Sequence, residues 1–224
     1  MKSSGTSRRA VGFPRPNRRE RRRLETRERI YRAALQIFAE RGYLETTVED
    51  ITEAADVGKG TFFNYFPTKE HVLATYGEQR VAAIESALKK AQLANHSVLA
   101  VLKELATDLA GQSSQSPELL RSIFAAHLSC APVRAELQTR LQRARRLLAE
   151  IFVVGQARGE IRRDRSAAEL ARLTHLILMG VTIAWALNPD SMLRKSAEDV
   201  WELFFPSLSV DVSRKGKPRR KARR

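Results

Sequence analysis

The chain has a single cysteine, Cys130, among its 224 residues. One cysteine excludes an intrachain disulfide and supplies too few thiolates for a zinc site, so we expect no bound metal and a reducing, cytoplasmic environment. The four histidines, His71, His96, His127 and His175, occur singly, without a His-x-x-x-His spacing or a paired acid. No constellation for nucleophilic, acid–base or metal chemistry is present in this pattern. We therefore predict that the chain is not an enzyme and uses no cofactor.

Long apolar runs are also lacking. No apolar segment follows the early arginines, so we expect no secretory signal. The longest uncharged stretch in the apolar region covers the 15 residues 173–187 and is interrupted by Thr174, His175 and Thr182. Because a membrane-spanning helix needs about 20 apolar residues, we interpret this stretch as a buried helix and expect no membrane partner.

The positive charge of the chain is concentrated at its two ends. The net charge is +15, yet residues 1–23 carry nine Lys or Arg against one acid, and residues 214–224 carry eight and no acid. Between them, residues 24–213 hold 23 basic and 24 acidic residues. The N-terminal end is rich in Ser, Gly, Pro and Arg, and the C-terminal end is mainly Lys and Arg with one Gly and one Pro. Neither has apolar periodicity, which predicts a disordered basic arm and a disordered basic tail.

Two interpretations of these ends stay open. As phosphate-binding arms they would release counterions from DNA, and the N-terminal arm has the stronger claim because it adjoins the DNA-binding module proposed below. The alternative is a solvated tail that keeps the protein soluble or, for the first twenty residues, a translation start placed too early.

Between the two ends, the sequence predicts an all-α fold. Alternation of the kind found in strands is absent, and glycine and proline occur at intervals that suit helices. Gly42 is expected to end the first helix in the αL conformation, Thr46 or Thr47 to cap the second, and Thr68 to cap the fourth. The expected helices number about nine: residues 24–41, 48–55, 59–65, 69–93, 97–110, 117–130, 132–155 or 132–159, 170–187 and 196–205.

The second and third of these helices form a candidate helix-turn-helix. They are short and are joined by the three-residue turn 56–58, which contains a glycine. Val57 is expected to fill the corner, and Phe62 and Phe66, four residues apart, to hold the second helix on the core. Lys59, Thr61, Phe63, Asn64 and Tyr65 are then left for the DNA groove and its flank, and their side chains suit contacts to base edges and phosphates.

At this point the sequence resembles a known family. Residues 24–75 look like the DNA-binding domain of the tetracycline-repressor (TetR) family. The resemblance is carried by five short motifs: Gly42-Tyr43, Thr47-Val48, Ala55-Asp56-Val57, Lys59-Gly60-Thr61-Phe62-Phe63 and Tyr65-Phe66-Pro67-Thr68-Lys69. Two positions depart from the family pattern: Asp56 stands where a glycine is common, and Phe63 where a tyrosine is frequent.

The resemblance implies DNA contacts by Lys59, Thr61, Asn64, Tyr65 and Lys69, with Thr47 facing a phosphate at a helix N-terminus. With two further residues of the recognition helix, the expected DNA-binding set is Thr47, Lys59, Gly60, Thr61, Phe63, Asn64, Tyr65 and Lys69. The expected organisation is a basic arm (1–23), a helix-turn-helix domain (24–75) joined by helix four to a ligand-binding and dimerisation domain (76–213), and a basic tail (214–224).

The resemblance further implies a homodimer formed through the last two helices and an inducer pocket in the larger domain. The helix 170–187 is apolar nearly all round, more than one subunit should need, although a central helix of a monomer has the same appearance. Candidate pocket residues mix apolar walls with a few polar groups: Phe124, His127, Leu128, Phe152, Gln156, His175 and Met179. Each can equally be ordinary packing. No basic cluster is visible inside the apolar helices, since Arg143, Arg145 and Arg146 suit a solvated face, and the pattern indicates no ligand class.

The sequence therefore predicts a DNA-binding transcriptional regulator, in particular a repressor that a small-molecule effector releases from a near-palindromic operator. The alternative is a non-specific or architectural DNA-binding protein that uses its basic tails. A phosphate loop at Gly58-Lys59-Gly60-Thr61 is rejected because Glu53 occupies the first required glycine position and Gly60 the Ser/Thr position.

Overall fold

The computed structural model describes residues 17–113, 116–189 and 193–210. The predicted basic tail at 214–224 and most of the predicted arm, residues 1–16, lie outside these ranges. Within them the chain forms nine α-helices and one short 3₁₀-helix, and its extended pairing is limited to an isolated bridge between Ile161 and Ser209. The prediction of an all-α fold with about nine helices is confirmed.

The helices follow one another with short connections. Their bounds are α1 (Arg18–Arg41), α2 (Val48–Ala54), α3 (Lys59–Tyr65), α4 (Lys69–Gln92), α5 (Val98–Ser113), α6 (Pro117–Ser129), α7 (Ala131–Ala157), α8 (Ala167–Leu187), α9 (Leu193–Phe204) and η1 (Phe205–Leu208). The fifth helix was expected to end at residue 110, before Gly111, but α5 continues through this glycine to Ser113. One glycine costs a helix only about 1 kcal/mol relative to alanine, which neighbouring packing offsets.

Helix α1 begins earlier than predicted. The expected disordered arm ran to residue 23, but Arg18 to Arg23 form the first turns of α1. The start is fixed by a capping box, in which the Asn17 side chain accepts from the Glu20 N–H and the Glu20 carboxylate accepts from the Asn17 N–H. Five arginines are therefore held on a rigid helix that is continuous with the helix-turn-helix.

Gly42 ends α1 with φ 84° and ψ 152°. The positive φ agrees with the expectation, but the ψ lies outside the αL region in which we had placed this residue. This combination of angles is open almost only to glycine, so the turn into α2 depends on Gly42.

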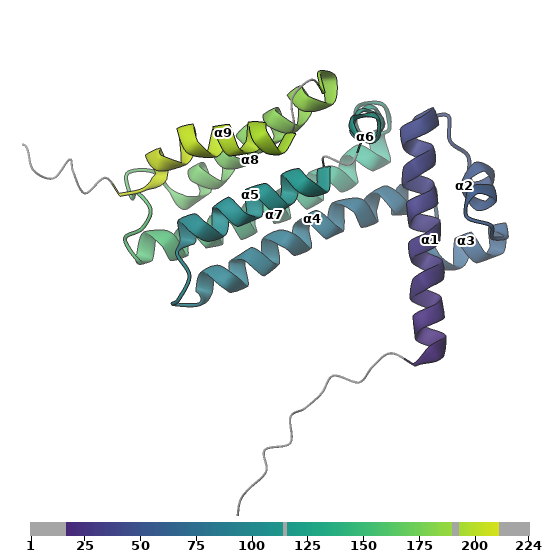
Figure 1. Cartoon of the computed structure of the whole chain (residues 1–224), viewed down its shortest axis with the longest axis horizontal. Helices are drawn as coiled ribbons and strands as arrows, with labels where there is room; N and C mark the ends of the chain where they lie inside the picture. Colours follow the sequence, from purple (N-terminus) through teal and green to yellow (C-terminus); the bar gives the residue numbers. More distant parts are fainter. Residues whose placement is uncertain (1–16, 114–115, 190–192, 211–224) are drawn as a thin grey trace, which may run out of the picture.

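The helix-turn-helix lies at one end of the molecule, and α4 runs from it into the body alongside α7 (Figure 1). Helices α5, α8 and α9 complete the body, and α6 is seen nearly end-on beside α1 (Figure 1). One hydrophobic core fills the body between α4, α5, α7 and α8 and includes the fully buried Ile151 and Phe152.

A second hydrophobic core lies under the helix-turn-helix, and a helix of the body contributes to it. Phe38, Ile51 and Phe62 of the N-terminal helices pack in one cluster with Leu119 and Ile123 of α6. The boundary expected at residue 75 therefore does not separate two cores. The helix-turn-helix completes its core with a helix that belongs, by sequence, to the larger domain.

Helix α8 is less buried than predicted. Of its most apolar 18-residue window, with a mean hydropathy of 1.6, only 28% is buried within the described part of the chain. By length and composition alone this helix could cross a membrane. Leu173, Leu176, Ile183 and Leu187 are exposed by 37%, 45%, 37% and 72%. The expectation of a buried helix is therefore wrong for the single chain, which leaves an apolar stripe uncovered.

Candidate nucleic-acid interface and candidate ligand cavity

The helix-turn-helix is built as its sequence predicted. Thr47 caps α2, with its hydroxyl accepting from the Asp50 N–H at 3.1 Å. Asp56 takes the turn with φ 49°, a left-handed conformation that explains the family's preference for glycine there. The Val57 N–H then donates to the Thr52 carbonyl at 3.0 Å and closes the turn.

Two aromatic side chains fix the orientation of α3. Phe62 and Phe66 are buried, with their ring centroids 5.9 Å apart, and the Arg27 guanidinium lies 5.1 Å from the centre of the Phe66 ring. Because this face of α3 is packed, its other face is left to solvent. There Lys59, Gly60, Phe63 and Asn64 are exposed, and Thr61 and Tyr65 are half-buried.

Lys59 has an ion-pair partner in the free protein. Its ammonium is paired with the carboxylate of Glu49 on α2, and this hydrogen bond is the main reason that the pKa of Glu49 is lowered. Both side chains are more than half exposed. A phosphate that approaches Lys59 therefore has to compete with Glu49.

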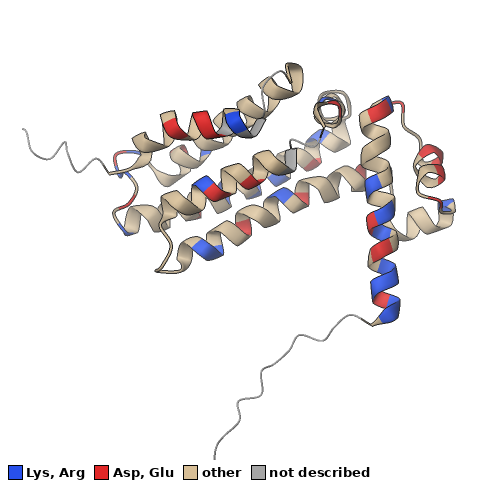
Figure 2. Cartoon of the chain, viewed as in Figure 1, with Lys and Arg blue, Asp and Glu red and all other residues tan. Residues whose placement is uncertain are grey.

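A groove of about 700 Å³ runs between α3 and the first turns of α1. Figure 2 shows the basic residues gathered at this end of α1. The groove is lined by Asn17, Arg19, Glu20, Arg22, Arg23 and Thr26 from the start of α1 and by Thr61, Asn64 and Tyr65 from α3. Three arginines thus face the same space as three of the predicted DNA-binding residues. Sequence reasoning missed this juxtaposition because it placed these arginines in a disordered arm.

Lys69 does not lie in this groove. Its ammonium donates to the carbonyls of Tyr43 and Thr46 at 3.0 and 2.9 Å, and lies 4.5 Å from the centre of the Tyr43 ring. A third carbonyl, of Leu44, is 3.5 Å away. An ammonium has three donors, and here the loop between α1 and α2 takes them up. In the free protein Lys69 therefore has a structural role, and the DNA contact expected for it would have to replace these hydrogen bonds.

The Thr47 hydroxyl is engaged as well. It donates to the Asp50 carboxylate at 2.6 Å, and this carboxylate also pairs with Arg41 at 2.7 Å. The N-terminus of α2 thus already has an anion, and the phosphate expected at Thr47 would have to compete with it.

The body holds a mainly apolar cavity of about 180 Å³ between α4, α5, α6, α7 and α8. Four of the predicted pocket residues line it: Phe124, His127, His175 and Met179. The prediction is corrected for the others. Phe152 is fully buried in the body core, Gln156 donates to the carbonyls of Arg162 and Arg165, and Leu128 is 79% exposed.

The two histidines in the cavity wall are neutral near pH 7. Burial, followed by the charge of Arg140, lowers the pKa of His127 to about 4. Burial, followed by the charges of Arg145 and Arg80, lowers the pKa of His175 to about 4. Among the described residues, His127 Nδ1 and His175 Nε2 are buried without a hydrogen-bond partner.

The cavity wall also contains two arginines, Arg80 and Arg140. The sequence showed no basic cluster inside the apolar helices, but the structure brings these two arginines, from α4 and α7, to one cavity wall. The sequence spacing of Arg140 did not predict its burial, because its neighbours on α7, Arg143 and Arg146, are exposed as expected. Arg145 is half-buried, and its Nε has no hydrogen-bond partner among the described residues.

The sequence and this architecture are similar to those of known transcriptional regulators. The sequence profile described as "Bacterial regulatory proteins, tetR family" matches residues 30–76. The HTH-type transcriptional repressor DhaR of Mycobacterium sp. is 31% identical over 161 residues, which cover 66% of this chain and 76% of DhaR. The transcriptional regulator TcmR of Streptomyces glaucescens is 45% identical over 60 residues, but this match spans only 27% of this chain and 26% of TcmR.

A solved structure extends the similarity to the body. The FadR repressor of Thermus thermophilus, crystallised with lauroyl-CoA, is 33% identical, with a TM-score of 0.60 over 82% of this chain and 95% of FadR. The chain belongs to the TetR family. It is a helix-turn-helix transcriptional regulator that binds DNA.

In this TetR-family chain, α6 connects the cavity to the DNA-binding helices. Ile123, Phe124 and His127 of α6 line the cavity. On the same helix, the buried hydroxyl of Ser122 accepts from the Tyr43 N–H at 2.7 Å. Helices α4 and α6 are therefore both in contact with the cavity at one point and with the helix-turn-helix at another.

Proposed function

We propose that this TetR-family chain is a one-component repressor that binds a near-palindromic operator as a homodimer and is released from it by a small molecule. The observation that carries the proposal is the placement of the cavity on α4 and α6. These two helices also hold the helix-turn-helix, so a ligand in the cavity can bias its position.

On the DNA side, α3 is the recognition helix. Lys59, Thr61, Asn64 and Tyr65 are the residues that we expect at base edges and phosphates, with Gly60 allowing close approach and Phe63 a flanking apolar contact. Arg19, Arg22 and Arg23 across the groove would hold the adjoining phosphates. In a dimer, two such helices read half-sites in successive major grooves, about one helical turn apart or somewhat more.

The dimer is supported by the uncovered stripe of α8. Leu173, Leu176, Gly180, Ile183 and Leu187 follow one another at spacings of three and four and therefore share one helix face. A second copy of this face would cover them, as in the hydrophobic interfaces of obligate dimers. The same pairing accounts for the apolarity of α8 in a cytoplasmic protein without a membrane partner.

The ligand side is supported by the cavity and by the relatives. DhaR is named a repressor, and the related FadR binds lauroyl-CoA. The wall of this cavity combines apolar side chains with a few polar groups, which is typical of small-molecule sites. We propose a role in binding and not in catalysis, so the cavity residues have no catalytic assignment.

The experiment that tests the proposal is the selection of bound sequences from genomic and random DNA with the full-length protein. We expect a near-palindromic site, bound at least a thousandfold more tightly than random DNA. Lys59→Ala and Asn64→Ala should abolish this preference, while Arg29→Ala, on an exposed part of α1 outside the groove, should keep it. If the wild-type protein binds the selected site and random DNA with nearly equal affinity, the result would instead favour the non-specific or architectural alternative.

A further inference from the structure

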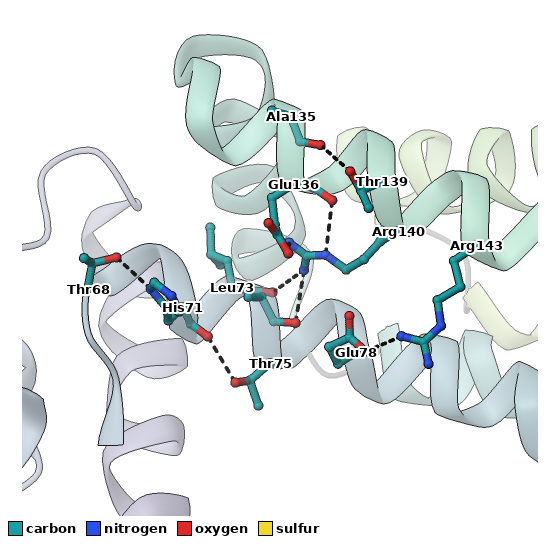
Figure 3. Close-up of polar contacts among 11 residues, drawn as sticks. Thr68, His71, Leu73, Thr75, Glu78, Ala135, Glu136, Thr139, Arg140 and Arg143 are labelled. Carbon is teal, nitrogen blue, oxygen red and sulfur yellow. Dashed lines mark hydrogen bonds and ion pairs between the residues drawn. The ribbon is translucent and has the colours of Figure 1, made fainter. Parts of the chain in front are cut away.

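Among the described residues, Arg140 is the one charged residue that is fully buried, with 7% of its surface exposed. It lies on α7 and turns toward α4 (Figure 3). Its Nη1 donates to the carbonyls of Leu73 and Ala74 at 3.2 and 3.0 Å, and its Nε donates to the Glu136 carbonyl at 3.4 Å. The Glu136 carboxylate is 3.5 Å from Nη2, but it is 56% exposed to water. Glu78 also attracts the guanidinium, but its carboxylate is half exposed and pairs with Arg143 at 3.1 Å. The guanidinium is thus rich in hydrogen bonds, and both carboxylates that attract it are exposed to water.

The rest of the cavity wall does not supply the missing negative charge. None of the residues that line the cavity carries a carboxylate, whereas Arg140 brings a positive charge into its wall. The imidazoles of His127 and His175 add buried nitrogens without partners. An apolar space with an excess positive charge and unused hydrogen-bonding atoms is complementary to an organic anion with an apolar body. At about 180 Å³ the cavity is slightly larger than the ~150 Å³ that holds a benzene ring.

Helix α4 has a notch for this arginine. A Cβ at Gly77 would lie 2.3 Å from Arg140 Nη1 and 3.1 Å from Cζ. The guanidinium therefore occupies the space that a side chain at residue 77 would fill. From there it holds the carbonyls of Leu73 and Ala74, which lie one turn closer to the helix-turn-helix. Arg140 thus contacts the cavity and the DNA-binding end of α4 at the same time.

We propose that the cavity binds a small organic carboxylate with an apolar body, and that Arg140 is both its anion-binding group and the latch that fastens α4 to α7. When the carboxylate binds, the guanidinium turns toward it and leaves the carbonyls of Leu73 and Ala74. Helix α4 can then shift, and with it the helix-turn-helix. This inference rests on the proposed release by a small molecule and assigns the chemical class of that molecule.

The ligand half is tested with matched acid and amide pairs, because an amide has the shape of its acid without the charge. Binding of benzoate and benzamide, phenylacetate and phenylacetamide, and octanoate and octanamide to the full-length protein is measured by calorimetry. In at least one pair we expect the acid to bind about tenfold more tightly than its amide. In Arg140→Met this preference should vanish. The inference is overturned when no acid exceeds its amide, or when the preference survives in Arg140→Met.

The latch half is tested by Gly77→Ala, which keeps Arg140 but fills its notch. We expect Gly77→Ala to weaken operator binding without ligand by about tenfold, as Arg140→Met should. Gly111→Ala on α5 is the matched control, because a Cβ there meets nothing within 4 Å. Its operator affinity should equal that of the wild type. Wild-type affinity for Gly77→Ala, with retained helicity, overturns the latch. Release of the operator by an amide but not by its acid would overturn the ligand class and leave the proposed function standing.

Discussion

At the scale of single residues, the ion pair between Lys59 and Glu49 reduces the positive charge that α3 presents to solvent in the free protein. Lys59 is the first residue of the recognition helix, and Glu49 holds its ammonium from α2. For Lys59 to contact DNA as proposed, this carboxylate has to be exchanged for a phosphate. Among exposed groups such an exchange gains little energy and depends on salt.

Glu49→Gln should therefore raise operator affinity. We expect an increase of about two- to fivefold at low salt, because the substitution frees Lys59 and removes a negative charge near the phosphates. Fluorescence anisotropy with the selected operator measures the effect. Glu53→Gln is the control, since it makes the same charge change on α2 at an exposed residue away from Lys59. Equal gains in the two variants would show that general charge, and not the ion pair, limits binding.

Asp56 and Gly42 are two of the three described residues with a positive φ, a backbone conformation that favours glycine; their φ angles are 49° and 84°. Asp56→Gly should stabilise the fold by about 0.5 kcal/mol, because relief of left-handed strain exceeds the entropy that glycine adds to the unfolded chain. Gly42→Ala should destabilise it by about 1–3 kcal/mol. Thermal or urea unfolding measures both changes. A destabilised Asp56→Gly would mean that the aspartate side chain contributes more than its backbone strain costs.

At the scale of elements, the early start of α1 adds positive charge beside the recognition helix. Residues 24–75 hold six basic and nine acidic residues, so this part of the helix-turn-helix repels a phosphate backbone. With α1 beginning at Arg18, residues 18–75 hold 11 basic and 10 acidic residues. The added arginines lie on a helix that faces α3 across the groove, and a rigid helix fixes their distance from the DNA.

Arg22→Gln should lower operator affinity and flatten its salt dependence. We expect the slope of log K against log salt to fall by about one, the value for one lost phosphate contact. Sequence preference should stay unchanged, since the contact that we propose for this arginine is to the DNA backbone and not to bases. Arg29→Gln, also on α1 but outside the groove, should leave the slope as it is. An unchanged slope of log K against log salt in Arg22→Gln would contradict the proposed phosphate contact and indicate that these arginines are only solvated surface residues.

At the scale of the whole molecule, the exposed stripe of α8 supports the proposed homodimer. Leu176→Glu should convert the protein from a dimer, with about twice the chain mass of 25.3 kDa, into a monomer. Because Leu176 is 45% exposed in the single chain, we expect the subunit fold to survive. Light scattering after size exclusion measures the mass, and circular dichroism the fold. Leu93→Glu, an exposed leucine at the end of α4, should remain dimeric. A dimeric Leu176→Glu would place the interface elsewhere.

The sequence by itself determined the family and most of the local structure, apart from the start of α1 and the end of α5. Short-range chemistry decides caps, turns and amphipathic faces, so the Thr47 cap of α2, the turn at 56–58 and the packing of Phe62 and Phe66 followed from spacing alone. The recognition helix could be predicted to the residue for the same reason.

Tertiary structure decided which polar groups remain available and where the positive charge is buried. Lys69 was predicted to contact DNA, yet the carbonyls that hold it come from a loop more than twenty residues away. Arg140 resembles its solvated neighbours in sequence, and only the packing of α7 on the Gly77 notch of α4 buries it beside the cavity. Charge on a helix has the same local pattern whether water or another helix covers it. Its role is therefore set by contacts between residues that are distant in the chain.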